Sequence, residues 1–342
     1  MRKRKINILP SYLSTIVTQI FEHPVGPANK SRTLLVYDED SELARLLSTA
    51  YRQILPHATV IDFNQSNAAK IKEAISTLSA GDLVILVQST SFRLDAFRIR
   101  VHLFEQRLKV IEHPHLGRVR KEEIETYVAS LEYDKNYYHR VGPELKNKLD
   151  QAKEVKLISG EHALIYNGEL EVAKLNIGDY RGMKNVGGQF PIGEVFTELQ
   201  DLTRLNGTVA LFAFGDQNFS VFNCKTPIHL EIKEGKVIQT HSTLPEFESV
   251  LAEIRAHEGD IWVRELGFGL NRALTRTSQI RHDVGIYERM CGTHLSLGSK
   301  HALYPKTGFH KKKVKCHVDV FAAIDLATID GEVIYQNGAY TL

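Results

Sequence analysis

The chain of 342 residues is long for one hydrophobic core and predicts two domains, and a composition of 43% hydrophobic and 25% charged residues is that of an ordinary globular protein. Its 43 Lys and Arg residues against 41 Asp and Glu residues leave a net charge of +2, which argues against a nucleic-acid or membrane partner. No apolar run reaches the ~18 residues of a membrane span, and the first residues do not have the pattern of a signal peptide. The three cysteines show no CxxC spacing, so we expect no disulfide framework and a cytoplasmic protein.

The first part of the chain alternates short apolar runs with segments of helical periodicity. Strands are predicted at 33–37, 58–63 and 82–90, and helices at 38–55 and 67–78. This alternation is typical of an α/β fold with a mostly parallel, doubly wound sheet. No glycine-rich phosphate loop follows the run at 33–37, which argues against dinucleotide binding.

The second part of the chain is richer in strands. A charged helical stretch at 121–153 precedes it, and one further helix is predicted at 244–257. Alternating apolar and polar residues predict hairpins around three turn signals, which are Asn167-Gly168, Glu234-Gly235 and Asp330-Gly331. We therefore expect an α/β domain over 1–155 and a strand-rich α+β domain over 156–342.

Four stretches of the second part concentrate side chains that can bind a metal. They are "GGQFPIGEVFTE", "RELGFGLNR", "YERMCGTHLSLG" and "KCHVDVF", and the candidate ligands are Glu194, Glu265, Glu288, His294, His317 and Asp319. Carboxylates among glycines and apolar residues are costly to bury unless a positive charge pairs with them. This donor set favours one or two divalent metals, although the histidines could also be ordinary structural residues in a chain that has 15.

The spacing of His317 and Asp319 supports a shared ligand role. "VKCHVDVF" has the composition of a strand, and residues i and i+2 of a strand point to the same face. Both side chains can then reach one ion. In two-metal hydrolases the acids bridge the ions, and one acid remains free to act as a general base.

The same stretches resemble the motifs of the aminopeptidase T family, the M29 metallopeptidases. "PIGEVFT", "ELGFGLN", "ERMCGTHLSLG" and "HVDV" follow the order of the family's motifs. The resemblance implies that the six candidates are the ligands of two divalent metals, zinc, cobalt or manganese, and that Glu265 also acts in catalysis. It also implies a flavodoxin-like first domain, a homodimer, and the removal of N-terminal residues from a peptide or small amide substrate.

The chain departs from the family in its third motif. It reads Gly-Thr-His where the family has Gly-Thr-x-His, so one residue is missing between Glu288 and His294. His301 stands where the family has a catalytic tyrosine, and Tyr304 follows three residues later. His301 and Tyr304 are therefore the candidates for a hydrogen-bond donor to a developing oxyanion.

Two other functions agree with the same residues. The family resembles the 2,5-dihydroxypyridine dioxygenases, in which two histidines and one carboxylate hold Fe(II). His294, His317 and Asp319 would supply that set here, whereas the acid at Glu265 argues against it. The other alternative is an accessory protein that has kept the fold without the chemistry.

Overall fold

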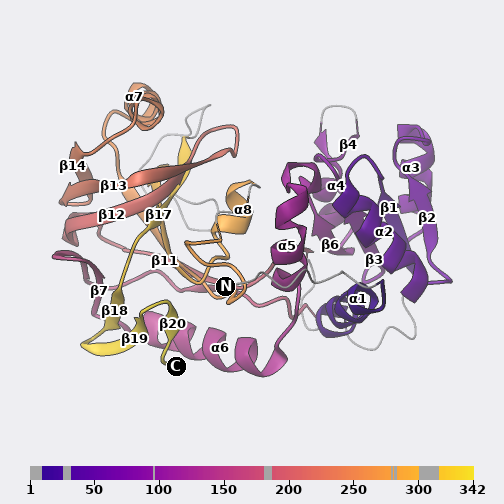
Figure 1. Ribbon diagram of the computed structural model, residues 1–342, viewed down its shortest axis with the longest axis horizontal. Coiled ribbons are helices and arrows are strands. Elements are labelled where there is room, and N and C mark those ends of the chain that lie inside the picture. The colour runs from indigo at the N-terminus through magenta and orange to yellow at the C-terminus, as the bar shows by residue number, and fades with distance from the viewer. Residues whose placement is uncertain are drawn as a thin grey trace. The chain divides into compact units, whose positions relative to one another are not determined.

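The computed structural model describes residues 10–25, 32–94, 97–180, 187–278, 280, 283–299 and 316–342. The chain divides into two units, of which the first comprises residues 1–135, 178–192 and 280–282 and the second the remainder (Figure 1). The charged helical stretch therefore divides at Lys135, and its longer helix belongs to the second unit. Both units mix helices with sheet, as the predicted α/β fold class requires.

The first unit alternates strands and helices as the sequence predicts. Its strands are β1 (Thr33–Tyr37), β2 (Thr59–Asp62), β3 (Leu83–Val87), β4 (Arg93–Leu94), β5 (Phe97–Arg98), β6 (Lys109–His113) and β10 (Gly187–Gln189). Its helices are α1 (Pro10–Val25), α2 (Glu42–Ile54), α3 (Ala68–Ser76), α4 (Ile99–Glu105), α5 (Ile124–Ser130) and the 3₁₀ turns η1 (Leu116–Arg118) and η2 (Lys121–Glu123). The side chains of Ser41 and Asn67 accept hydrogen bonds from the first turns of α2 and α3, which explains where these helices begin.

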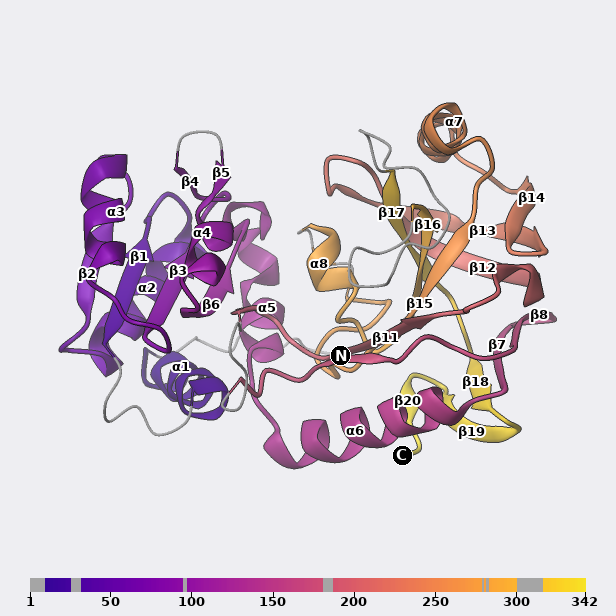
Figure 2. The same ribbon diagram turned by 180° about the vertical axis from the view of Figure 1, so that it is seen from behind.

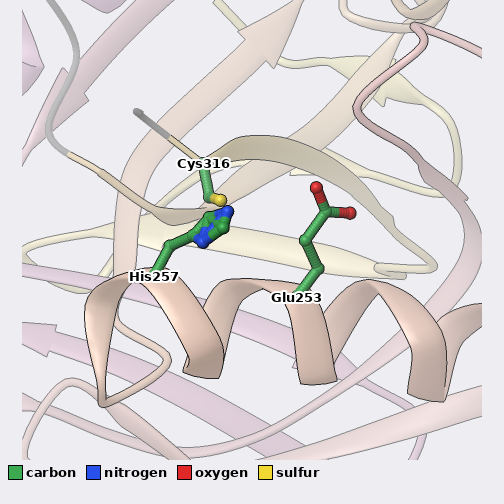
Figure 3. Close-up of side chains that lie close together, drawn as sticks. All are labelled: Glu253, His257 and Cys316. Carbon is green, nitrogen blue, oxygen red and sulfur yellow. The ribbon is translucent and has the colours of Figure 1, made fainter. Parts of the chain in front are cut away.

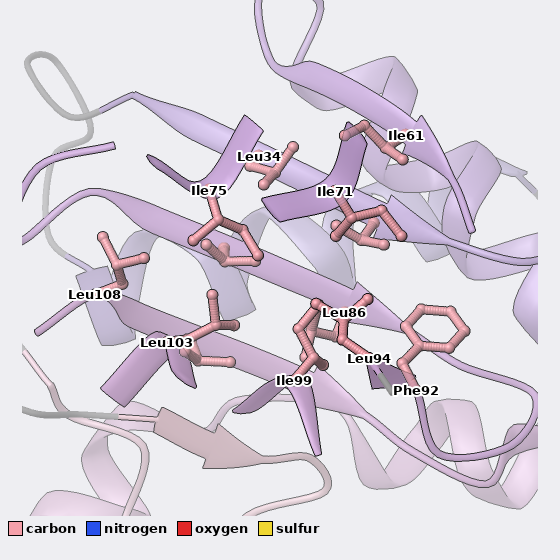
Figure 4. Packing of buried hydrophobic residues seen from close by; sticks show 13 residues of the cluster. Leu34, Ile61, Ile71, Ile75, Leu86, Phe92, Leu94, Ile99, Leu103 and Leu108 are labelled. Carbon is pink, nitrogen blue, oxygen red and sulfur yellow. The ribbon is translucent and has the colours of Figure 1, made fainter. Parts of the chain in front are cut away.

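The main sheet of the first unit is parallel, in the order β10-β6-β3-β1-β2. Read from β2, this is the flavodoxin-like arrangement, in which the strand order reverses beside the first strand. One face of the sheet packs against α3 and α4, where Ile71, Ile75 and Leu103 meet Leu34 and Leu86 of the strands (Figure 4). Alternate residues of β1 and β3 face the other way and are also buried, because α2 packs there.

The second unit is built around antiparallel strands. Its helices are α6 (Lys135–Gln151), α7 (Pro245–Glu258), α8 (Val284–Tyr287) and the 3₁₀ turn η3 (Leu202–Arg204). Its strands are β7 (Glu154–Ser159), β8 (His162–Asn167), β9 (Lys174–Asn176), β11 (Glu194–Glu198), β12 (Leu205–Gly215), β13 (Val221–Lys233), β14 (Lys236–His241), β15 (Val263–Gly269), β16 (Gly292–Gly298), β17 (His317–Ala322), β18 (Leu326–Ile329), β19 (Glu332–Gln336) and β20 (Ala339–Tyr340).

Two of the three predicted hairpins are confirmed. β13 and β14 turn at Glu234-Gly235, and β18 and β19 turn at Asp330-Gly331. The prediction for Asn167-Gly168 was wrong, because the hairpin of β7 and β8 turns at Gly160. Asn167 instead ends β8, and the next strand, β9, pairs with β11.

Four neighbouring strands of this sheet carry the motifs found in the sequence. The order β17-β16-β15-β11 places these strands side by side, although β11 and β17 are far apart in the chain (Figure 2). They contain the motif residues His317 and Asp319, His294, Glu265 and Glu194 respectively. The described residues contain no helix that is long and apolar enough to cross a membrane.

Candidate metal centre

His317 and Asp319 lie on one strand, as the sequence predicts. They are the first and third residues of β17, and His317 Nε2 lies 3.2 Å from Asp319 Oδ1. Asp319 is buried, whereas the side chain of His317 keeps 30% of its surface exposed. The other ring nitrogen of His317 lies 3.3 Å from the carbonyl oxygen of Ser299, which orients the imidazole toward the aspartate.

His294 comes from the neighbouring strand β16 and lies over a gap in β15. It is paired in register with Gly267. A Cβ atom at Gly267 would lie 2.0 Å from His294 Nε2, so only glycine leaves room for the ring in this position. Gly269 leaves a similar gap for a different segment, because a Cβ there would lie 2.0 Å from the carbonyl oxygen of Met290. The Gly-x-Gly spacing of "ELGFGLN" is thus a steric requirement of the centre.

Glu194 and Glu265 both contact the same nitrogen of His294. His294 Nε2 lies 3.2 Å from Glu194 Oε1 and 3.3 Å from Glu265 Oε1, and all three side chains are buried. Ligands that lie about 2.1 Å from one ion stand roughly 3.0–3.4 Å apart in octahedral or tetrahedral coordination. The spacing of these three donor groups therefore suits a common metal ion.

Glu288 joins the cluster from the end of a short helix. It follows α8, whose first turn is capped by the Asp283 side chain. Arg289, the next residue, is buried and places Nη1 2.6 Å from Glu288 Oε2 and 2.9 Å from Glu194 Oε2. One guanidinium therefore holds two candidate ligands from different segments.

The remaining contacts join these pairs into one cluster. The negative charge of Glu265 acts on the imidazole of His317, and Glu288 hydrogen-bonds to Asp319. All six side chains predicted as ligands are thus brought together, within the second unit alone.

The histidines carry the positive charge that the acids require. Burial lowers the pKa of His294, but its hydrogen bonds with Glu194 and Glu265 outweigh this and raise the pKa to about 10. Burial also lowers the pKa of His317, and the charge of Asp319 again outweighs it, giving about 10. Without a metal, protonated imidazoles therefore take the place of a cation among the carboxylates.

The pKa values of the acids shift in opposite directions, depending on which charged groups lie next to each carboxyl. Burial raises the pKa of Glu194, but Arg289 and His294 together bring it below its usual value. Burial raises the pKa of Glu288 to about 8, with further repulsion from Glu194 and Asp319 and an opposing effect of Arg289. Glu288 is thus the acid that carries a proton near neutral pH, and it donates that proton to Asp319.

The donor chemistry of the cluster matches a divalent metal. Carboxylate oxygens and neutral imidazole nitrogens are ligands for zinc, manganese and cobalt, and each metal ion would displace the protons that the histidines carry. With both histidines neutral, the guanidinium of Arg289 faces four acids of the cluster, and the ion pairs that these acids form among the described residues leave an excess of negative charge in a buried place. These residues therefore have both the ligand types and the charge that one or two divalent ions require.

Sequence reasoning did not identify Arg289. Its signal was an arginine that directly follows a candidate acid in "YERMC", where the other three residues are apolar or aromatic. Arginine is rarely buried without a partner, and this one is buried. His301 and Tyr304, the candidates for an oxyanion donor, lie outside the described residues.

Comparisons with known proteins show a shared fold. No family model and no curated protein sequence matches the chain. The structure is similar to that of 2,5-dihydroxypyridine dioxygenase from Pseudomonas putida KT2440, with a TM-score of 0.61 and 14% identity over 98% of each chain. It is also similar to wild-type AmpT from Thermus thermophilus, with a TM-score of 0.60 and 12% identity over 96% of this chain and 99% of that one.

Proposed function

We propose that the protein is a metal-dependent amide hydrolase that acts like an aminopeptidase and releases N-terminal residues from a peptide or small amide. The observation that carries the proposal is the convergence of four carboxylates and two histidines from four adjacent strands and the end of α8. The fold shared with AmpT, an aminopeptidase T, supports this choice.

The six side chains form two sets by their contacts. Glu194, Glu265 and His294 form one set, and His317 and Asp319 form the other, with Glu288 bonded to Asp319. We assign one divalent ion to each set, with zinc, cobalt or manganese as the suitable metals. When bound, such ions polarise a carbonyl group and lower the pKa of a water molecule.

Glu265 is our candidate for the residue that transfers the proton as a general base and then a general acid. It contacts His294 of the first set, and its charge acts on His317 of the second. An acid between the two sets is suited to orient the attacking water, accept its proton and pass it to the leaving amine. His301 and Tyr304 remain predicted donors to the oxyanion.

A non-haem iron dioxygenase of the 2,5-dihydroxypyridine type is the second candidate, favoured by the equal likeness to that enzyme. His294, His317 and Asp319 would then hold Fe(II) as two histidines and one carboxylate. The contacts of Glu194 and Glu265 with His294 favour the hydrolase, because a facial triad leaves no role for two further buried acids.

Metal content and hydrolysis of aminoacyl amides test the proposal together. Protein purified without chelator should contain zinc, cobalt or manganese, and adding metal after chelation should restore release of the amine. The double variant His317→Ala with Asp319→Ala should lose the ion assigned to that set. Glu265→Gln, whose amide oxygen can still coordinate, should retain metal while kcat falls at least about 100-fold. Light scattering of the same samples tests the homodimer.

Glu198→Gln is the matched control for these variants. Glu198 lies opposite Glu265 in the β11–β15 register and is equally buried, but it pairs with Arg264 instead of a candidate ligand. This variant should lose stability and keep its metal. If the protein contains one iron per chain and opens the ring of 2,5-dihydroxypyridine with oxygen, the dioxygenase assignment would replace the hydrolase assignment. If the protein is free of metal and inactive, the accessory role would be favoured.

A further inference from the structure

A second group of metal-capable side chains lies between α7 and the residue before β17, and it shares no side chain with the candidate metal centre. Glu253 and His257 project from α7, and Cys316 immediately precedes β17 (Figure 3). The carboxylate oxygen, imidazole nitrogen and thiol sulfur lie within 4.8 Å of one another.

The helix presents two of these donors together because of its periodicity. Glu253 and His257 are four residues apart and therefore share one side of α7. The apolar side of α7, which includes Val250 and Ile254, is buried and anchors the helix to the unit. His257 also lies in the last helical turn, where the helix dipole favours a positive ion.

The third donor is fixed by hydrogen bonds to the same end of the helix. The carbonyl oxygen of Cys316 accepts a hydrogen bond from Ser299 N at 2.6 Å, and Ser299 Oγ donates to Glu258 Oε1 at 2.6 Å. Cys316 is fully buried, whereas Glu253 and His257 are exposed. The sulfur is therefore the buried member of the group, and the two helix side chains are its solvent-exposed members.

The chemistry of the group points to a metal rather than a reactive thiol. A thiol without exposed surface is poorly placed to attack a substrate, and its two neighbours here are further metal-ligand types on an exposed part of the helix. Carboxylate, imidazole and thiolate together are typical zinc ligands, and three protein ligands leave a fourth position for water. We infer that Glu253, His257 and Cys316 bind a zinc-like divalent ion that joins α7 to the start of β17.

The sulfur distinguishes this group from the candidate metal centre. None of the six ligands proposed there is a cysteine, so a thiolate bond to metal cannot come from that centre. The inference is independent of the hydrolase activity, because the binding of an ion here needs no substrate and no catalytic residue.

Cobalt titration of the chelated, reduced full-length protein tests the inference. Thiolate bound to Co²⁺ gives a strong near-ultraviolet charge-transfer band, which should grow to saturation during the titration and disappear on adding Zn²⁺. His257→Ala and Glu253→Ala should weaken cobalt binding, as followed by this band, at least about tenfold. Both change exposed residues, so the helix should remain folded by circular dichroism.

Cys316→Ser should abolish the band, while Cys291→Ser and Arg255→Ala should leave it unchanged. Cys291 is a second buried thiol, and Arg255 is an exposed residue on the same helix. Absence of the band in wild-type protein with excess cobalt, or its persistence in Cys316→Ser, would overturn the inference.

Discussion

Gly267 shows how a residue without a side chain can shape the candidate metal centre. Replacing it with alanine puts a Cβ where His294 Nε2 lies, so the ring must move away from Glu194 and Glu265. We expect Gly267→Ala to weaken the binding of metal by Glu194, Glu265 and His294 at least about tenfold. Titration calorimetry measures this, and Gly331→Ala, in a turn with open space around it, is the control that should leave affinity unchanged. Equal affinities in wild type and Gly267→Ala would contradict the role of the gap.

Arg289 leads to a prediction about stability without metal. Arg289→Met leaves Glu194 and Glu288 close together without their shared cation, and removing one member of a buried ion pair costs about 3–5 kcal/mol. The chelated variant should be less stable by about this amount, and metal should restore most of the loss because the ion supplies the missing charge. Urea denaturation with and without metal measures both values. A loss that metal does not reduce would mean that Arg289 acts through packing alone.

At the residue scale, the sequence predicts contacts between residues that are close together in the chain. His317 and Asp319 could be paired from their spacing alone, since a strand places alternate residues on one face. The contact of Glu194 with His294 could not be derived in this way, because the two residues are brought together by the strand order β16-β15-β11. The partner of a buried acid is likewise set by tertiary structure, which is why Arg289 was missed.

At the element scale, His113 joins β6 to α2. Its Nε2 lies 2.8 Å from the hydroxyl of Tyr51, and burial lowers the pKa of His113 to about 3. The unfolded chain takes up this proton below about pH 6.5 and the folded chain only near pH 3, so stability falls as pH decreases through that window, by about 1.4 kcal/mol per pH unit.

His113→Gln should remove this slope. Glutamine does not titrate and can still bond to Tyr51, so the free energy of unfolding should depend less on pH between 6 and 4 than in the wild type. Denaturant titrations across this range make the comparison, with the exposed His57→Gln as the matched control. If the two variants have the same slope, His113 is not the group responsible.

Elements were predicted well where one periodicity dominates. The runs that became β1, β3 and α7 have clear apolar patterns and lie where the sequence placed them. The Asn-Gly signal at residue 167 failed because β8 also pairs with β12 and β9 pairs with β11, so the local turn preference is overridden by partners elsewhere in the sheet.

At the scale of the whole molecule, all proposed ligands belong to one unit. Metal should therefore stabilise the second unit and leave the first unchanged, since an ion stabilises only the structure that binds it. Calorimetry should show one transition that falls on chelation and another that does not. The His317→Ala and Asp319→Ala double variant, which keeps the first set of ligands, should show part of the fall that chelation produces in the wild type. An equal shift of both transitions would refute independent stabilisation.

The path of the chain through the two units has a consequence for its synthesis. The parallel sheet of the first unit ends with β10, yet β7, β8 and β9 of the second unit come earlier in the sequence. A growing chain therefore carries these strands of the second unit before the first unit can complete its sheet. Residue 193 then returns the chain to the second unit, one position before Glu194. The edge strand of one unit and the first acid of the candidate metal centre thus leave the ribosome almost together.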